Sequence, residues 1–220
     1  MTLRPSPARH PRRSHAERSA ATQQHLIATA IEVIQTGGLE EMSIHQLARR
    51  AGLSSGAVQH HFDSKAALMM RVLDELLASD ALQSQLLPDP AAPLAARAAH
   101  FVRALWQQVY AQPRFIAAWH IYLGSRSQPE VLAHVQRQRE SVGRRVRAQF
   151  ATALPELSRL PSGPREALVA MALSTLRGMG LLTLFAPPSH AQSDQLDCLI
   201  GLIVDQCRAA AQLTAPPDTR

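Results

Sequence analysis

The feature that most constrains the fold of this chain is a series of closely spaced helix boundaries in residues 43–65. Ser43 is a favourable N-cap for a helix over residues 44–51, and Gln46 follows three residues later, as in a capping box. Gly52 ends this helix after two turns, and Ser54 caps a second short helix that runs to residue 62. Two short helices joined by a glycine-containing turn have the layout of a helix-turn-helix motif.

The rest of the sequence is also typical of helices. Residues 19–36 form an amphipathic pattern that ends at Gly37-Gly38, and Asp63-Ser64 precede a long helix expected from Lys65 to about Leu87. Valine and isoleucine rarely alternate with polar residues, which favours helices over strands. Prolines separate five further helices, expected at residues 94–111, 113–125, 128–153, 164–185 and 192–213. We therefore predict an all-α protein.

Four segments are expected along the chain. Residues 1–18 form a flexible basic arm, residues 19–66 a three-helix domain with the helix-turn-helix, residues 67–213 a larger helical domain, and residues 214–220 a frayed tail. The arm has five arginines and one glutamate, so it carries most of the net charge of +6. A basic arm beside a helix-turn-helix can enter the minor groove of DNA, and the alternative interpretation is a solvated tail.

The second short helix is the one expected to contact DNA, because the N-terminal part of the second helix of this motif enters the major groove. The side chains expected to anchor the motif are Ile44, Leu47, Ala48, Ala51, Leu53, Val58 and Phe62. The side chains expected to face DNA are Ser54, Ser55, Gly56, Ala57, Gln59 and His60. The short residues at 55–57 allow close approach of the backbone, and Gln59 can pair with an adenine edge.

Residues 43–65, SIHQLARRAGLSSGAVQHHFDSK, resemble the DNA-binding segment of the TetR (tetracycline-repressor-like) family, and the resemblance extends over about residues 19–75. The resemblance implies base contacts at residues 55–57, phosphate contacts at His60, His61 and Lys65, and a position at the edge of the groove for Ser43 and His45. Family members commonly have a tyrosine where this chain has Gln59, so the resemblance does not fix the contact that Gln59 makes.

Several of these residues have a second interpretation. His61, next to a buried phenylalanine, also fits a packing role, and Arg49 and Arg50 fit either a solvated surface or phosphate contacts. Lys65 also fits an exposed position with no DNA contact.

The larger domain has no catalytic arrangement, phosphate-binding loop or metal-ligand spacing, so we expect no enzyme activity, no metal and no cofactor. Its aromatic residues concentrate between residues 101 and 122, which fits either a simple core or the wall of a pocket. The resemblance implies that this domain senses a small apolar or amphipathic ligand. The candidate pocket residues are Trp106, Trp119, His120, Tyr122, Met171 and Phe185.

The last two long helices are unusually apolar, and Arg177 is the only ionised residue of residues 167–185. Such helices should be buried on most of their surface, either within one subunit or, as the resemblance implies, in a four-helix bundle with a second copy. Gly178 and Gly180 would then allow close approach. Cys198 and Cys207 are nine residues apart and lie on opposite faces of the last helix, so they cannot form a disulfide within it.

These features together predict a transcriptional regulator, most simply a repressor that binds a palindromic operator in double-stranded DNA as a homodimer and is released by a ligand. The alternatives are an activator of the same family and, in a different class, a helical partner-binding adaptor without ligand sensing. A helical enzyme or carrier would leave residues 43–65 unexplained. Without a signal peptide or a run of about 18 apolar residues, the protein is expected in the bacterial cytoplasm, with no membrane association.

Overall fold

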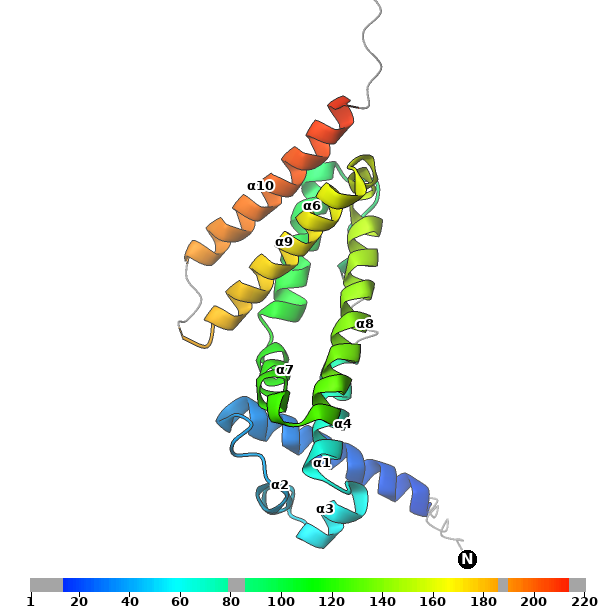
Figure 1. Cartoon of the computed structure of the whole chain (residues 1–220), viewed down its shortest axis with the longest axis vertical. Coiled ribbons are helices and arrows are strands. Elements are labelled where there is room, and N and C mark those ends of the chain that lie inside the picture. The colour runs from blue at the N-terminus through cyan, green and yellow to red at the C-terminus, as the bar shows by residue number, and fades with distance from the viewer. Residues whose placement is uncertain (1–13, 79–85, 186–189, 214–220) are drawn as a thin grey trace, which may run out of the picture.

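The computed structural model describes residues 14–78, 86–185 and 190–213, and all regular structure in these ranges is helical (Figure 1). The all-α prediction is therefore confirmed. The main helices are α1 (His15–Gly37), α2 (Ile44–Ala51), α3 (Ser55–His61), α4 (Lys65–Leu77), α6 (Leu94–Leu105), α7 (Pro113–Gly124), α8 (Pro129–Ala153), α9 (Ser162–Leu182) and α10 (His190–Leu213). Three short turns of helix, η1 (Trp106–Tyr110), η2 (Ser125–Ser127) and η3 (Pro155–Arg159), connect them.

The first helix begins earlier than expected. Ser14 caps it in a capping box, in which the Glu17 backbone N–H donates to Ser14 Oγ (3.2 Å) and the Ser14 N–H donates to Glu17 Oε2 (2.6 Å). The last residues of the expected arm, 15–18, are therefore helical. Residues 1–13 of the arm and the expected tail at 214–220 lie outside the described residues.

The fourth helix ends at Leu77, so the expectation that it continues to about Leu87 is wrong. Carbonyl groups at its end accept hydrogen bonds from arginines of other helices. Arg114 Nη2 lies 2.9 Å from the Glu75 oxygen, and Arg145 Nη2 lies 3.4 Å from the Leu77 oxygen. Side-chain donors of this kind satisfy the free carbonyl groups at a helix end. Because the donors are distant in the sequence, the local sequence pattern does not predict these contacts.

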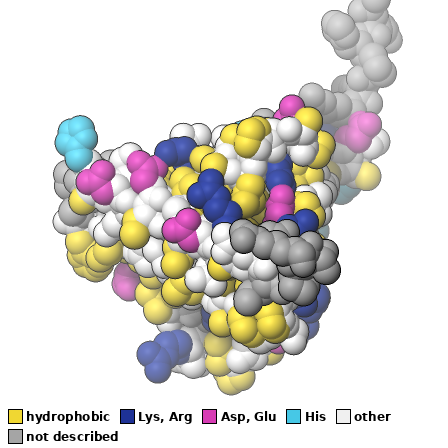
Figure 2. Space-filling view, turned by 90° about the horizontal axis from the view of Figure 1, so that it is seen from above, with side chains coloured by type: hydrophobic (Ala, Val, Ile, Leu, Met, Phe, Trp, Pro, Cys, Tyr) yellow, Lys and Arg dark blue, Asp and Glu magenta, His cyan; other side chains and the backbone are white. Residues whose placement is uncertain are grey.

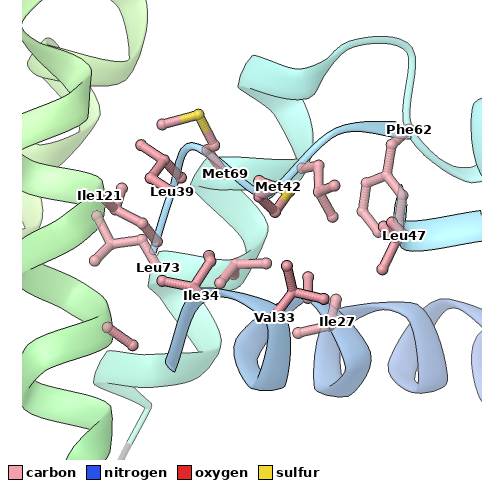
Figure 3. Packing of buried hydrophobic residues seen from close by; sticks show 14 of the residues in the cluster. Ile27, Val33, Ile34, Leu39, Met42, Leu47, Phe62, Met69, Leu73 and Ile121 are labelled. Atoms are coloured by element: carbon pink, nitrogen blue, oxygen red, sulfur yellow. The ribbon is translucent and has the colours of Figure 1, made fainter. Parts of the chain in front are cut away.

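The first hydrophobic core joins α1, α2, α3 and α4 to the larger domain. Ile27 of α1 lies near Leu47 and Phe62, whereas Ile34 of α1 lies near Leu73 of α4, on the side from which Ile121 of α7 enters the same core (Figure 3). Val131 and Val135 of α8 also belong to it. The core that supports the helix-turn-helix therefore continues past residue 66 and includes residues of α7 and α8.

The second core fills the far end of the molecule, between α6, α8, α9 and α10. Phe101 of α6 and Phe150 of α8 meet edge to face with their ring centroids 4.7 Å apart, a favourable geometry for two aromatic rings. Seen from this end, charged side chains of both signs alternate with hydrophobic ones on the surface (Figure 2).

The last two helices run antiparallel beside each other along one side of the molecule (Figure 1). Large apolar side chains are exposed on or next to them: Met171, Leu182, Leu184, Phe185 and Leu202. Gly178 has open space where a β-carbon would lie. Gly180 differs, because a β-carbon there would meet the Tyr110 carbonyl oxygen and Phe115 Cε1 at 2.8 Å. Gly180 therefore allows α9 to pack closely against η1 and α7 of the same subunit. No described helix is both long and apolar enough to cross a membrane.

The two cysteines of α10 should differ sharply in reactivity. Cys198 is exposed and Cys207 is buried, which agrees with their expected positions on opposite faces of the helix. Burial raises the pKa of the Cys207 thiol to about 11, with Glu156 adding to the effect and Arg97 opposing it. The reactive thiolate is therefore scarce at pH 8.

We expect the Cys198→Ser protein to show no thiol reactive toward Ellman's reagent at pH 8 while folded, and one after unfolding in guanidinium. The absorbance of the released thiolate measures this directly. Rapid labelling of the folded Cys198→Ser protein would show that α10 is not packed as described.

Candidate DNA-binding face and ligand cavity

The helix-turn-helix is fixed by three consecutive serine caps, as the sequence predicted. The backbone N–H groups of Gln46, Ala57 and Ala67 donate to the hydroxyls of Ser43 (3.1 Å), Ser54 (3.2 Å) and Ser64 (3.0 Å), respectively. Each such cap contributes about 1 kcal/mol to helix stability. The expected capping box at Gln46 is not formed, because its side-chain oxygen accepts from Arg49 Nη2 (2.9 Å) instead.

The turn between α2 and α3 has the geometry that only glycine adopts easily. Gly52 has φ 68° and ψ 28°, in the left-handed region. His25 of α1 lies with Nε2 3.2 Å from the carbonyl oxygen of Ala51, which ties the turn to the supporting helix. The expected anchors are in place: Leu47, Ala48, Val58 and Phe62 are buried, and Ile44, Ala51 and Leu53 are partly buried against them.

The third helix presents one face to solvent. Val58 is its only buried residue, and Gly56, Gln59 and His60 are exposed. The side chains of Gln59 and His60 make no hydrogen bond or ion pair with any described residue, although the His60 and His61 rings meet edge to face at 5.4 Å. A short helix anchored by one buried residue and capped at its start leaves its outer groups free to contact another molecule.

One contact within the motif was not anticipated from the sequence. His45 Nδ1 on α2 shares a hydrogen bond of 2.9 Å with the Ser55 hydroxyl on α3. This bond orients Ser55. It connects His45, which was expected at the edge of the DNA groove, with Ser55, which was expected to contact bases. Their spacing of ten residues across a turn gave no local indication of it.

Positive groups lie beside the exposed face. Lys65 is the first residue of α4, half-buried, with no ion pair or hydrogen bond to a described residue. Arg49 bonds to Gln46, and Arg50 lies 3.8 Å from Glu41 in an exposed pair. Exposed pairs of this kind exchange readily with other partners, since they contribute about 0–1 kcal/mol.

A cavity of about 490 Å³ lies in the larger domain, between α4, η1, α7, α8 and α9. Its volume is typical of pockets for small ligands. Of the six candidate residues, Trp119 and Tyr122 line the cavity, whereas Trp106, His120, Met171 and Phe185 do not.

The residues that miss the cavity do so for identifiable reasons. Trp106 packs against the second core. His120 follows Trp119 directly, so it lies on another side of α7, where its ring approaches Gly38. Met171 and Phe185 face outward and are 44% and 83% exposed.

The cavity wall contains residues that the sequence did not single out as ligand contacts. Tyr110 and Phe115 continue the aromatic wall, and five arginines from α7, α8 and α9 also line it: Arg114, Arg139, Arg145, Arg147 and Arg177. Arg177 was recognisable as an isolated charge in an apolar helix, but its direction depends on how α9 packs against α7.

Burial raises the pKa of both cavity tyrosines, Tyr110 and Tyr122, and the positive charges of Arg177 and, for Tyr122, Arg139 partly oppose this effect. Both phenols are therefore protonated at neutral pH and can donate hydrogen bonds. Within the described ranges, no group of three or more histidine, cysteine or acidic residues is arranged to hold a metal ion.

The architecture defines a class of protein, in which a helix-turn-helix DNA-binding domain is joined to a larger helical domain with a partly open cavity. Residues 26–72 match the family described as bacterial regulatory proteins, tetR family. This N-terminal segment is therefore a DNA-binding domain of the TetR family, and the curated relatives that match it are HTH-type transcriptional regulators. The resemblance found in residues 43–65 is thereby confirmed.

Known relatives match part of the chain. The HTH-type transcriptional regulator SrpR of Pseudomonas putida is 36% identical over 61 residues, covering 28% of this chain and 29% of SrpR. The chain spans between 29% and 55% of the length of the curated relatives it matches.

Two solved structures share the fold over most of the chain. A transcriptional regulator from Rhodococcus sp. Rha1 has a TM-score of 0.65 and 23% identity, covering 84% of this chain and 96% of its own. A transcriptional regulator from Saccharomonospora viridis, solved in complex with choline, has a TM-score of 0.66 and 16% identity, with the same coverage of 84% and 96%.

Proposed function

We propose that this protein is a transcriptional repressor that binds a palindromic operator as a homodimer and leaves it when a small molecule enters the cavity. The observation that carries the proposal is the exposed face of α3, which is capped, anchored and unpartnered. Its short residues at 55–57 suit insertion in the major groove of DNA. The proposed place of action is the cytoplasm, where the operator would be.

In this proposal the residues divide into two groups. Ser55, Gly56, Ala57 and Gln59 contact base edges, while Ser43, His45, Ser54, His60, His61 and Lys65 surround them and contact or approach phosphates. Base contacts determine sequence preference, whereas phosphate contacts position the protein and give a salt-dependent affinity. Residues 1–13 lie outside the described residues, and the arm is proposed to add minor-groove contacts.

The proposed dimer uses the apolar surface of α9 and α10. The exposed side chains of Met171, Leu182, Phe185 and Leu202 would otherwise remain in water, and Gly178 leaves room for a neighbouring helix. A two-fold axis through this surface would place two copies of α3 for two half-sites about one helical turn apart.

The link between cavity and DNA is proposed to pass through α7 and α4. Trp119 and Tyr122 of α7 line the cavity, while Ile121 of the same helix is buried in the hydrophobic core that also contains Leu47 of α2 and Val58 of α3. Asp74 of α4 accepts from His134 Nε2 (2.7 Å) and Gln138 Nε2 (2.8 Å) of α8, another cavity helix. A ligand that moves α7 or α8 would shift the spacing of the two α3 helices, which is a population shift between two states. The choline complex of the Saccharomonospora viridis regulator shows that a protein of this fold accommodates a small molecule.

The test is to recover DNA fragments bound by the purified protein from fragmented genomic DNA and to sequence them. We expect a recurring palindrome whose half-sites are about one helical turn apart. Folded dimeric protein that enriches no sequence would contradict the proposal.

Two variants then separate the two kinds of contact. Lys65→Ala should weaken binding to all sequences similarly and reduce the slope of log affinity against log salt by about one unit. Gln59→Ala should change the preferred base at one position of each half-site by about 1–3 kcal/mol while leaving that slope unchanged. Arg137→Ala, at an exposed position of α8, is the matched control and should change neither quantity. If Lys65→Ala leaves the salt slope as it was, Lys65 does not contact a phosphate.

A further inference from the structure

The cavity wall points to one chemical class of ligand, and we infer that it is an aromatic carboxylate whose charge is bound by Arg177. This inference rests on the proposed function, because it names the ligand class for the cavity through which DNA binding would be regulated. Three observations support it: the positive charge of the cavity wall, the arginines in the wall that have no hydrogen-bond or ion-pair partner, and the aromatic side chains beside them.

The described wall is strongly positive. It contains five arginines and one acidic residue, Glu140. Glu140, Arg139, Arg145 and Arg147 are exposed, whereas Arg114 and Arg177 are half-buried. Arg114 and Arg145 bond to carbonyl groups at the end of α4. Arg139, Arg147 and Arg177 make no ion pair or hydrogen bond with a described residue, so three guanidinium groups remain available for an anion.

Arg177 is the best placed of these three to hold a ligand. It is the only ionised residue of residues 167–185, it is half-buried, and its charge acts on both Tyr110 and Tyr122. A charge in an apolar wall costs free energy unless it is paired. A carboxylate meets this need, because it forms two parallel charge-assisted hydrogen bonds with a guanidinium group.

The rest of the wall fits a flat apolar body. Tyr110, Phe115, Trp119 and Tyr122 form a continuous row, in which successive ring centroids are 5.2, 6.3 and 5.5 Å apart. Aromatic rings of a ligand would pack against the edges and faces of this row. The volume of about 490 Å³ accommodates one drug-sized molecule.

The same wall disfavours an organic cation. Aromatic rows can bind cations through their ring faces. Here the guanidinium of Arg139 already lies over the Tyr122 ring, 5.9 Å from its centroid, and Arg177 lies near both tyrosines. A cationic ligand would therefore meet positive charge along the row, whereas an anionic ligand would be attracted by it.

The experiment compares three probes with the same body: naphthalene-2-carboxylate, naphthalene-2-carboxamide and 2-naphthyltrimethylammonium. The full-length dimer carries Trp106→Phe, so that its fluorescence reports on Trp119 in the cavity wall. Binding is followed by fluorescence and by melting temperature. Operator affinity is measured with and without each probe.

We expect the carboxylate to bind at least about tenfold more tightly than either analogue. Arg177→Met should remove this preference by weakening carboxylate binding about tenfold to a hundredfold, while carboxamide binding stays the same. Arg137→Met is the matched control, because Arg137 is exposed on α8 and does not line the cavity, and it should leave all three affinities unchanged.

Three results would overturn the inference: binding of the carboxamide or the ammonium probe as tight as that of the carboxylate, unchanged carboxylate binding in Arg177→Met, or binding of none of the three probes. Operator binding without a probe tests the proposed function separately. Carboxylate binding through Arg177 that leaves operator affinity unchanged would support the ligand class and refute ligand-induced release.

Discussion

Gly56→Glu is expected to lower the affinity for the operator by at least about a hundredfold, since a carboxylate placed against DNA phosphates costs several kcal/mol. The substitution should leave the fold intact. A β-carbon at Gly56 would meet only Ser54 Oγ, at 4.0 Å, and a helical glycine is replaced favourably by most other residues. The loss would therefore report on the contact with DNA. Fluorescence anisotropy with a labelled operator fragment measures it.

Gly163→Glu provides the matched control for this experiment. It adds the same charge at the start of α9, where a β-carbon meets nothing within 4 Å, far from α3 (Figure 1). Operator affinity should stay within about threefold of the unmodified protein, because an exposed charge beyond a Debye length of about 8–10 Å is largely screened. Binding of Gly56→Glu as tight as that of this control would show that α3 does not enter the groove.

Glu156→Ala is expected to lower the free energy of unfolding by about 3 kcal/mol, because it leaves the Arg97 guanidinium buried without its counter-charge. Arg97 of α6 is 7% exposed and makes a two-pronged pair with Glu156 of η3, in which one bond, from Nη1 to Oε2, is 3.2 Å long. It also donates to the carbonyl oxygens of Ala92 and Ala153, both at 2.9 Å. Urea unfolding at a fixed protein concentration measures the change.

The matched control is another arginine–carboxylate pair of α6. Arg103 Nη2 lies 2.5 Å from Asp197 Oδ1, but the two side chains are 47% and 55% exposed. Asp197→Ala should therefore cost less than about 1 kcal/mol. Equal effects of the two substitutions would contradict the burial that distinguishes the pairs.

The pH dependence of the Glu156 contribution follows from its pKa. Burial raises this pKa, but hydrogen bonds from Arg97 and from its own backbone, with the charges of Arg97 and Arg159, outweigh burial and lower it below its usual 4.5. A carboxyl with a lowered pKa stabilises the folded state above its ordinary pKa and loses this contribution as the pH falls through the lowered value. The difference in stability between the unmodified protein and Glu156→Ala should thus be full near pH 7 and shrink as the pH falls below 4.5.

The sequence by itself determined the helix-turn-helix, because its boundaries depend on local interactions. Ser43, Ser54 and Ser64 each cap a helix only three residues away, and Gly52 adopts a left-handed conformation that few other residues tolerate. The apolar faces of α1 and α2 were equally evident from their spacing. Even here the sequence did not predict the hydrogen bond between His45 and Ser55, because it joins two helices.

The larger domain was only partly determined in this way. Its prolines and apolar patterns predicted helices at nearly the observed positions, but α4 ends at Leu77, where arginines from α7 and α8 bond to its last carbonyl groups. Only tertiary packing decided which aromatic residues line the cavity, since neighbours such as Trp119 and His120 face different sides of one helix. The same holds for the arginines, which come from three helices and meet only in the folded chain. Local rules set where a helix begins and ends, whereas the composition of a cavity depends on the relative rotation of several helices, which no single segment encodes.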